Sequence, residues 1–519
     1  MKTVIFGSGH EGINYFLDTK DEVVAFLDNA REKQGKYILD VPILPAKAVV
    51  DLVYDRIYVA IIDGEQSLAA RKQLRAMGIS PDVVDYWEQE TTDESIIIRT
   101  NCYESARAVG QMYCELSYRS QIERFEKQWR SIKKSYKGVR LLRISVCNIG
   151  EFIVRYNVIL HCEDFHDKDI YTICIPDGKA YAGLRHSVCN HKLLEYVSKD
   201  INLIYKKDEL LFWSYVISVH AYELILIDYE KYINRGNEPT SYLTNAYKDR
   251  ILFTAEEKNR WQQKSDKMGI TGKYICFAAR SSDYHNKEFG TDLTAEGRNM
   301  PFSDYDKSII YLRKQGIQSV RIGRGTPLKN AVDGCVDYAG NYADECYDWY
   351  LIANGLFMVS SESGITCMAG FVRRPLLVVN IHYFAIGGSG LEFTEYDLFI
   401  PQKVYSRDKH RLLTLSERIA LEPNLFFKLN QENLDKYEIE FIPNTQEEIL
   451  EATSEMLLRI EGKWEESEKD ISDRNRFNEI LKEESDKLRL NKDIAWAFGP
   501  MKYISIASSY LRKNAYLLD

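Results

Sequence analysis

The sequence predicts an α/β protein of several domains, each built around a parallel β-sheet. The chain has 519 residues, which is more than one hydrophobic core usually serves. Short apolar runs alternate with helix-length amphipathic segments, a pattern typical of parallel strands covered by helices on both faces. A glycine-rich turn, GSGHEG, joins the first apolar run to the first helical segment, as expected where a strand meets a helix.

Residues 1–90 form the first predicted domain, because four apolar runs alternate there with helical or polar segments. We expect strands at TVIF (3–6), VVAFLD (23–28), RIYVAII (56–62) and PDVVDYW (81–87), with a helix at 67–78. This stretch has its own strands and its own glycine turn, so we expect it to fold as an independent unit.

The remaining chain divides into two further α/β regions with helical segments before and after them. The predicted parts are a helical connector at 91–137, an α/β region at 138–270, a second at 271–455 and a helical tail at 456–519. The α/β regions contain apolar runs such as VRLLRISVC and YICFAA, whereas the connector and tail are charged and helix-periodic. Two adjacent Rossmann-like regions predict a two-lobed body with its ligands at the carboxyl ends of the strands.

Composition excludes several classes of protein. The net charge of −9 argues against a nucleic-acid partner, which needs a basic surface. The ten cysteines form no C-x-x-C pair, and several lie in apolar runs, so we expect a reducing compartment and no disulfide framework. No signal peptide is recognisable, and no stretch reaches the ~20 apolar residues that cross a bilayer. We therefore expect a cytoplasmic protein.

The N-terminal glycine turn fits G-x-G-x-x-G through Gly7, Gly9 and Gly12, directly after a strand and opening a helix. In that motif the glycines permit a tight turn, a diphosphate's approach and close helix packing, and Asp28 at the next strand end could grip ribose hydroxyls. The pattern VIFGSGHEG…VVAFLDN resembles small Rossmann-like domains at the N-terminus of bacterial sugar-modifying enzymes. That resemblance implies binding of a sugar nucleotide, or a role in assembly. A NAD-dependent oxidoreductase is a third interpretation, but the domain lacks a Tyr-x-x-x-Lys or comparable catalytic set.

Polar residues recur at successive predicted strand ends between residues 273 and 382. The series reads YICFAARSSDY, GRNMPF, a helix, QSVRIGR, VDYAGNY and DWYLIANGLFMVSSESGITCMAGF. It resembles a family of bacterial glycosyltransferases encoded among surface-polysaccharide genes, and more distantly the superfamily that includes the nodulation fucosyltransferases. The resemblance spans roughly 138–400 and reappears in SIASSYLRKNAYLL at the C-terminus. One departure is Ala278, which stands where the family's His-x-Arg has histidine.

The resemblance implies a GT-B fold, with an acceptor lobe at 138–270 and a nucleotide-sugar donor lobe at 271–455. Independently of the family, a leaving diphosphate needs its charge neutralised, and without a metal this falls to arginines and backbone N–H groups. Arg280 is the first candidate. The full set of predicted donor-binding residues is Arg280, Arg321, Gly323, Asp348, Ser360, Ser361, Glu362, Ser363 and Gly364.

Several of these residues keep two interpretations. Asp348 matches the superfamily's aspartate near the donor, or is an ordinary residue at a helix start. Glu362 could grip ribose hydroxyls within the serine-rich turn, whose other groups could cradle an anion. Arg324 could equally be solvent-exposed, and the loop after His382 could line the cleft or be a connector.

Glu151 is the candidate catalytic base. It follows Asn148-Ile-Gly150, and the family usually has histidine in its place, close to the acceptor. A carboxylate can serve as general base if burial raises its pKa toward neutrality. Alternatively, Glu151 is a residue of the first helical turn, which the helix dipole favours.

The sequence thus predicts a metal-independent glycosyltransferase that uses a nucleotide sugar and needs no cofactor. The acceptor would be a glycan, a lipid-linked molecule or a protein, in cell-surface polysaccharide or glycoconjugate synthesis. Peripheral contact with the inner face of the membrane and a homo-oligomer are both left open. The alternative is a non-catalytic sugar-nucleotide-binding or assembly protein with degenerate Rossmann domains, which the substituted positions Ala278 and Glu151 favour.

Overall fold

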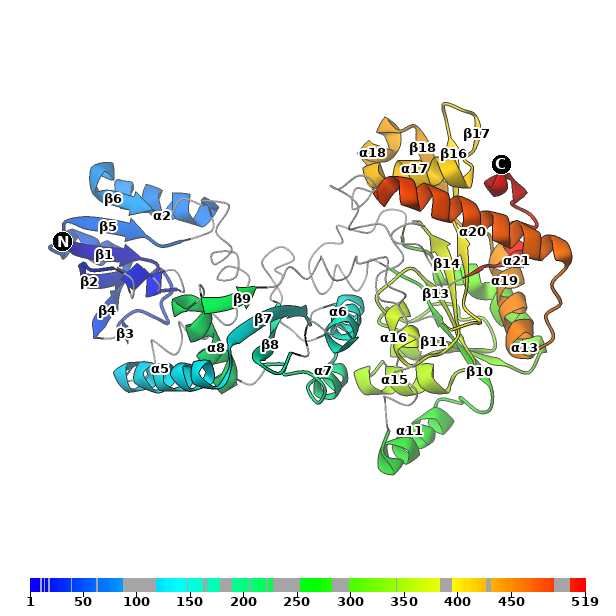
Figure 1. Ribbon diagram of the computed structural model, residues 1–519, viewed down its shortest axis with the longest axis horizontal. Helices are drawn as coiled ribbons and strands as arrows, with labels where there is room; N and C mark the ends of the chain where they lie inside the picture. The colour runs from blue at the N-terminus through cyan, green and yellow to red at the C-terminus, as the bar shows by residue number, and fades with distance from the viewer. Residues whose placement is uncertain are drawn as a thin grey trace. The chain divides into compact units, whose positions relative to one another are not determined.

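The computed structural model gives an α/β chain with parallel sheets (Figure 1). It describes residues 1–9, 12–13, 15–16, 19–38, 40–61, 64–86, 118–146, 148–161, 165, 167–177, 189–204, 207–220, 223–226, 253–281, 298–341, 343–382, 394–425, 431–489 and 505–519. The chain clusters into two compact units. The first comprises Met1–Ser145, Glu163–Ala180 and Ile201–Ile227, and the second comprises Val146–Cys162, Tyr181–Asp200 and Asp228–Asp519.

The N-terminal sheet of the first unit has six strands. Its spatial order is β3 (Tyr37–Ile38), β4 (Val41–Leu44), β2 (Glu22–Leu27), β1 (Lys2–Phe6), β5 (Arg56–Val59) and β6 (Val84–Tyr86). Only the β3–β4 pair is antiparallel. The predicted strands at 3–6 and 23–28 are confirmed, the one predicted at 56–62 is confirmed over Arg56–Val59, and the helix predicted at 67–78 is confirmed as α2 (Gly64–Ala76). The β3–β4 hairpin, which the sequence analysis did not anticipate, extends one edge of the sheet.

A second, three-stranded parallel sheet completes the first unit. Its order is β8 (Ile170–Asp177), β7 (Gly138–Ser145), β9 (Leu224–Leu226), and it is accompanied by α5 (Tyr118–Ser135) and α8 (Lys207–Val219). Phe125 and Trp129 of α5 contact Phe212 and Trp213 of α8. These aromatic residues share one buried apolar cluster with side chains of the N-terminal sheet, including Ile5. The predicted division of the chain at residues 90, 137, 270 and 455 stays a prediction.

The second unit is built on a seven-stranded, fully parallel sheet. Its order is β12 (Cys335–Asp337), β11 (Gln318–Arg321), β10 (Tyr274–Ala278), β13 (Met358–Ser361), β14 (Leu376–Ile381), β15 (Leu398–Pro401) and β19 (Ser505–Ile506). The first five strands in chain order follow the predicted apolar runs. The chain winds outward from β10 to β12, then returns to β13 beside β10 and winds the other way. This reversal makes the carboxyl ends of β10 and β13 the topological switch point.

Helices cover both faces of this sheet (Figure 1). One face carries α13 (Asp306–Lys314) and α19 (Gln446–Ile460), which pack on each other. The other carries α15 (Glu345–Asn354) and α16 (Thr366–Phe371), and α16 also packs against α6 (Ile149–His161). The strands between them are buried on both sides, as their continuous apolar sequences predict. Cys276 in β10 is fully buried, as expected of a cysteine inside an apolar run.

The C-terminal region combines a small sheet with the predicted charged helix. The sheet is antiparallel, in the order β17 (Arg411–Leu412), β16 (Lys403–Ser406), β18 (Ile439–Ile442), and its neighbours are α17 (Leu415–Leu425) and α18 (Gln431–Lys436). The charged helix is α20 (Glu468–Arg489). The tail is not helical throughout, because Ser505–Ile506 forms β19.

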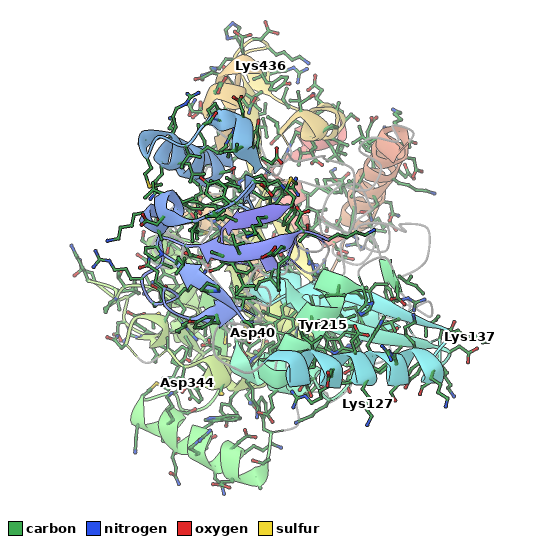
Figure 2. The ribbon with its side chains drawn as sticks, turned by 90° about the vertical axis from the view of Figure 1, so that its left-hand side faces the viewer. Asp40, Lys127, Lys137, Tyr215, Asp344 and Lys436 are labelled. Carbon is green, nitrogen blue, oxygen red and sulfur yellow. The ribbon has the colours of Figure 1, made fainter. Side chains whose placement is uncertain are left out.

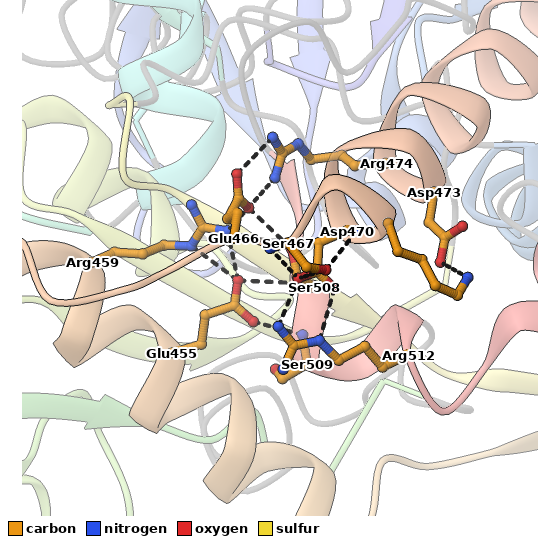
Figure 3. A network of polar contacts seen from close by, with 11 residues as sticks. Glu455, Arg459, Glu466, Ser467, Asp470, Asp473, Arg474, Ser508, Ser509 and Arg512 are labelled. Carbon is orange, nitrogen blue, oxygen red and sulfur yellow. Dashed lines mark hydrogen bonds and ion pairs between the residues drawn. The ribbon is translucent and has the colours of Figure 1, made fainter.

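A polar network fastens the last residues to α19 and α20 (Figure 3). Glu455, which is fully buried, accepts hydrogen bonds from the backbone N–H groups of Ser508 (3.1 Å) and Ser509 (2.8 Å). Asp470 accepts two hydrogen bonds of 2.7 Å from the Arg512 guanidinium. A buried carboxylate needs such partners, so these contacts hold the C-terminal segment beside β15, where β19 becomes the seventh strand.

Candidate functional site

The centre of the candidate site is the junction of the β10 and β13 ends. Arg280 lies two residues beyond β10, and its backbone N–H donates a 2.7 Å hydrogen bond to Oγ of Ser361, the last residue of β13. Both residues are buried. The two strand ends that form the switch point are therefore joined directly, at the place where open α/β sheets bind their ligands.

The serine-rich turn after β13 is organised by Thr366, a residue that the sequence analysis did not single out. Its hydroxyl donates to the Ser361 carbonyl (3.2 Å), accepts from the Ser363 backbone N–H (3.3 Å) and lies 3.2 Å from Ser360 Oγ. Ser360 is fully buried, and its own hydroxyl donates to the Ser361 carbonyl. Ser360 and Thr366 thus shape the turn from inside, whereas Gly364 is exposed.

Glu362 is held at the same turn by residues from two other segments. The His382 backbone N–H lies 3.4 Å and its ring Nδ1 3.1 Å from Glu362 Oε2, and Arg298 donates to the Glu362 carbonyl (3.3 Å). Burial raises the pKa of Glu362, but the His382 hydrogen bond and the Arg298 charge outweigh it and lower the pKa to about 2. Glu362 is therefore ionised, and its side chain keeps 36% of its surface exposed.

Arg298 and Asn299 belong to the site, although the sequence analysis quoted them only within GRNMPF. The Asn299 side-chain oxygen accepts a hydrogen bond from the Arg280 guanidinium. The Arg298 Nε is buried and has no hydrogen-bond partner among the described residues. The Arg280 backbone and the Arg298 guanidinium thus border one turn, at Ser361 and Glu362 respectively, while the Arg280 guanidinium is held by Asn299.

Arg321, the last residue of β11, and the loop that follows it have different roles. The Arg321 guanidinium donates to the Asp337 carboxylate (2.9 Å) and to the Thr326 carbonyl (2.9 Å), so its charge is paired within the second unit. Gly323 has a φ of +103°, a backbone conformation that favours glycine, and a Cβ at this position would lie 3.6 Å from Ile365 Cδ1. The loop after β11 therefore lies against the end of the serine turn.

Asp348 reaches this loop through Arg324. Its side chain is 6% exposed, and its Oδ2 accepts a 2.8 Å hydrogen bond from the 38% exposed Arg324. Burial raises the pKa of Asp348 to about 6, against the opposing effect of the Arg324 charge. The helix-start role in α15 belongs to Asp344, whose carboxylate accepts the backbone N–H groups of Cys346 and Tyr347 at 2.9 Å each.

Glu151 lies at the start of α6, within the same compact unit. A Cβ on the preceding Gly150 would lie only 3.0 Å from the Cα of Gly364, so the α6 turn and the serine turn are in close contact. One carboxylate oxygen of Glu151 is buried and has no hydrogen-bond partner among the described residues, and Arg155 lies 4.0 Å from it. The predicted base is therefore beside the predicted donor turn.

The N-terminal glycine turn is formed separately, at the β1–β5 switch point of the first unit. Gly7 has a φ of +110°, and a Cβ on Gly12 would lie 1.8 Å from the Gly7 carbonyl oxygen, whereas a Cβ on Gly9 would meet nothing within 4 Å. Asp28 accepts hydrogen bonds from the Ser8 backbone (3.1 Å) and hydroxyl (2.5 Å) and pairs with Lys33 (3.0 Å). In this arrangement Asp28 stabilises the turn itself.

Two negative findings concern only the part of the chain that the structure describes. No helix there is long and apolar enough to cross a membrane. No group of three or more His, Cys, Asp or Glu side chains is placed to hold a metal ion.

Comparison with known proteins finds resemblances at the level of structure alone. No family model matches the chain, and no curated protein matches its sequence. E. coli ADP-heptose LPS heptosyltransferase II shares 12% identity over 57% of this chain and 99% of its own, with a TM-score of 0.32. The glycosyl transferase family 9 protein of Veillonella parvula shares 11% identity over 62% of this chain and 97% of its own, with a TM-score of 0.34. The UDP-GlcNAc 2-epimerase of Neisseria meningitidis, bound to UDP-GlcNAc, shares 13% identity over 73% of this chain and 83% of its own, with a TM-score of 0.19. All three TM-scores lie below 0.5, so function has to be inferred from the chain's own residues.

Proposed function

We propose that this chain is a GT-B glycosyltransferase that moves a sugar from a nucleotide sugar to an acceptor hydroxyl. One observation carries the proposal. Arg280, Arg298 and the Ser361–Gly364 turn converge at the β10–β13 switch point, which offers positive charge and backbone N–H groups to one bound anion. A nucleoside diphosphate has the charge and the shape that such a site recognises.

The reaction makes a specific demand on these groups. The acceptor oxygen forms a bond to the anomeric carbon, the carbon–oxygen bond to the phosphate breaks, and the diphosphate leaves with the electron pair. Arg280 and Arg298 stabilise that developing negative charge by charge-assisted hydrogen bonds, which are stronger than neutral ones. Because two guanidinium groups supply the positive charge, we propose a reaction that needs neither a metal nor a cofactor.

Glu362 is proposed to bind the ribose of the nucleotide. A carboxylate whose pKa is lowered to about 2 accepts hydrogen bonds at any physiological pH, and ribose presents two neighbouring hydroxyl donors. His382 positions this carboxylate from the end of β14. Arg321 is proposed to act less directly, because its guanidinium is already paired with Asp337.

Glu151 is proposed to take the proton of the acceptor hydroxyl. Its turn touches the serine turn at Gly364, and one of its carboxylate oxygens is buried with no hydrogen-bond donor among the described residues. An acceptor hydroxyl placed beside that oxygen would supply the missing donor. The region around α6 would then present the acceptor, which we propose to be a glycan, a lipid-linked molecule or a protein in cell-surface glycoconjugate synthesis at the cytoplasmic side of the membrane.

The rival proposal is a non-catalytic sugar-nucleotide-binding or assembly protein. It is favoured by Ala278 and Glu151, which stand where the resembling family has histidines. The two proposals share nucleotide binding at Arg280 and differ in turnover. A donor-hydrolysis or transfer assay therefore separates them once a donor has been identified.

The experiment that tests the proposal is a thermal-shift screen with ADP-, GDP-, UDP-, CMP- and dTDP-sugars. A ligand at one hundred times its dissociation constant adds about 2.7 kcal/mol to the unfolding free energy. We expect one donor class to stabilise the wild-type chain and the Arg313→Ala control, but not Arg280→Ala. Arg313 forms an exposed ion pair with Asp333. It lies in the last turn of α13, just before β11 begins, and so at the amino ends of the strands, opposite the carboxyl ends that form the candidate site. Stabilisation that survives in Arg280→Ala would refute the assignment of the site.

A further inference from the structure

The exposed side of α5 (Tyr118–Ser135) is strongly basic in a chain that is acidic as a whole. The helix contains six basic and two acidic residues, whereas the chain carries a net charge of −9. The apolar side of the helix is buried in the core of the first unit, where Phe125 and Trp129 are each 1% exposed. The exposed basic residues are Arg124, Lys127, Arg130, Lys133 and Lys134, followed by Lys137 just beyond the helix.

The helical spacing spreads these charges over the solvent-facing half of α5. Residues three and four apart share a helix face, and by this spacing Lys127 and Lys134 lie on the side opposite Phe125 and Trp129. Arg124 lies at the flank of that side, with its guanidinium carbon 5.4 Å from the centre of the Phe125 ring. Figure 2 shows Lys127 on the outer side of α5 and Lys137 beyond its end. The stripe from Arg124 to Lys137 is about 20 Å long at 1.5 Å per residue.

Local carboxylates neutralise this stripe only in part. Arg130 lies 3.7 Å from Glu126, Lys133 pairs with Glu223, and Lys137 pairs with Asp169. Each of these three basic side chains is itself about half exposed or more, and such solvent-exposed pairs are weak and screened by salt. The stripe therefore presents a net positive charge to a partner that covers it.

We propose that the exposed face of α5 binds a surface of anionic lipid headgroups. The residues between the basic ones on this face are Glu123, which carries one negative charge, and the uncharged polar residues Gln128, Ser131 and Ser135, all of them exposed. The five exposed basic residues of the helix outnumber this carboxylate. Among the described side chains, Ile122 to Ser135, the exposed face thus lacks the apolar and aromatic anchors that form the centre of protein interfaces, and the stacking side chains that hold single-stranded nucleic acid. A layer of lipid phosphates needs only positive charge within a Debye length of the surface.

This binding is electrostatic and reversible. The apolar side of α5 is committed to the core of the first unit, so the helix has no apolar face with which to enter the bilayer. The inference does not depend on the proposed function. If that function also holds, α5 would bring the chain to the surface where a lipid-linked acceptor lies.

Sedimentation of the full-length chain with lipid vesicles tests the inference. Vesicles of phosphatidylcholine alone are compared with vesicles that also contain phosphatidylglycerol, at low and at physiological salt. The test variant is Lys127→Glu/Lys134→Glu. The control is Lys469→Glu/Lys482→Glu, which makes the same charge change on exposed positions of α20.

We expect the wild-type chain and the α20 control to sediment with phosphatidylglycerol vesicles and to be released by salt. The α5 variant should lose affinity by on the order of tenfold or more, since two attractive charges become repulsive. Equal binding by the two variants, binding to phosphatidylcholine alone, or no wild-type binding would overturn the inference. Preferential binding to duplex DNA or RNA over the vesicles would also overturn it and assign the face to nucleic acid.

Discussion

Asp348→Asn is expected to remove a pH-dependent component of the chain's stability. The Asp348 carboxyl is buried in α15, and its pKa is raised from the ordinary 3.8 to about 6, because burial disfavours the charged form more than Arg324 favours it. A folded-state pKa above the unfolded value means that protonation favours the fold. The stabilisation is present below about pH 4 and is lost as the pH rises through about 6.

The size of this component follows from the shift. A difference of about two pKa units at about 1.4 kcal/mol per unit gives about 3 kcal/mol. The difference in unfolding free energy between wild type and Asp348→Asn should therefore change by about this amount between pH 4 and pH 8. Asparagine keeps an oxygen that can accept the Arg324 hydrogen bond and has no charge to bury, so its relative stability should improve as the pH rises.

The assay is chemical denaturation of both proteins over this pH range. Asp344→Asn in the same helix provides a control of opposite sign. Burial raises the pKa of Asp344, but backbone hydrogen bonds in its N-cap position and the Lys264 charge outweigh it and lower the pKa, so its contribution is lost as the pH falls. A wild-type to Asp348→Asn difference that stays constant from pH 4 to pH 8 would refute the account of Asp348 as a buried acid behind Arg324.

Three further predictions concern the glycine turns and the reaction. Gly12→Ala should lower the melting temperature clearly, because the added Cβ would lie 1.8 Å from the Gly7 carbonyl oxygen. Gly9→Ala should leave the melting temperature unchanged, because its Cβ would meet nothing within 4 Å. Equal effects of the two substitutions would contradict the described turn. Gly150→Ala should reduce turnover more than donor affinity, because the added Cβ would push the Glu151 turn away from Gly364. Steady-state kinetics and donor titration on the same variant measure the two effects. An unchanged kcat would count against Glu151 as the base. Turnover should survive EDTA, and a strict requirement for a divalent metal would contradict charge neutralisation by arginines.

The features that the sequence predicted well depend on local patterns. Buried parallel strands need continuous apolar runs, and YICFAA and LFMVSS supply them for β10 and β13. Residues just after such strands meet at one edge of a sheet, which is why Arg280 and Ser361 could be expected to lie together. The predicted roles of these residues remain proposals.

The features that escaped prediction depend on partners distant in the chain. β19 has only two residues and exists because β15 pairs with it and Glu455 caps the following residues from 53 positions away. His382 and Arg298 reach Glu362 across 20 and 64 positions. The ion pair of Arg321 with Asp337 also requires the fold, because in the sequence both residues are simply polar strand ends.

The most direct test of the central claim is a crystal structure of the chain with the nucleoside diphosphate of its best-binding donor. The proposal predicts that the diphosphate lies within hydrogen-bond distance of the Arg280 guanidinium and the backbone of the Ser361–Gly364 turn. It also predicts ribose hydroxyls on the Glu362 carboxylate. A nucleotide bound solely at the Gly7–Gly12 turn, with the β10–β13 switch point empty, would contradict the account.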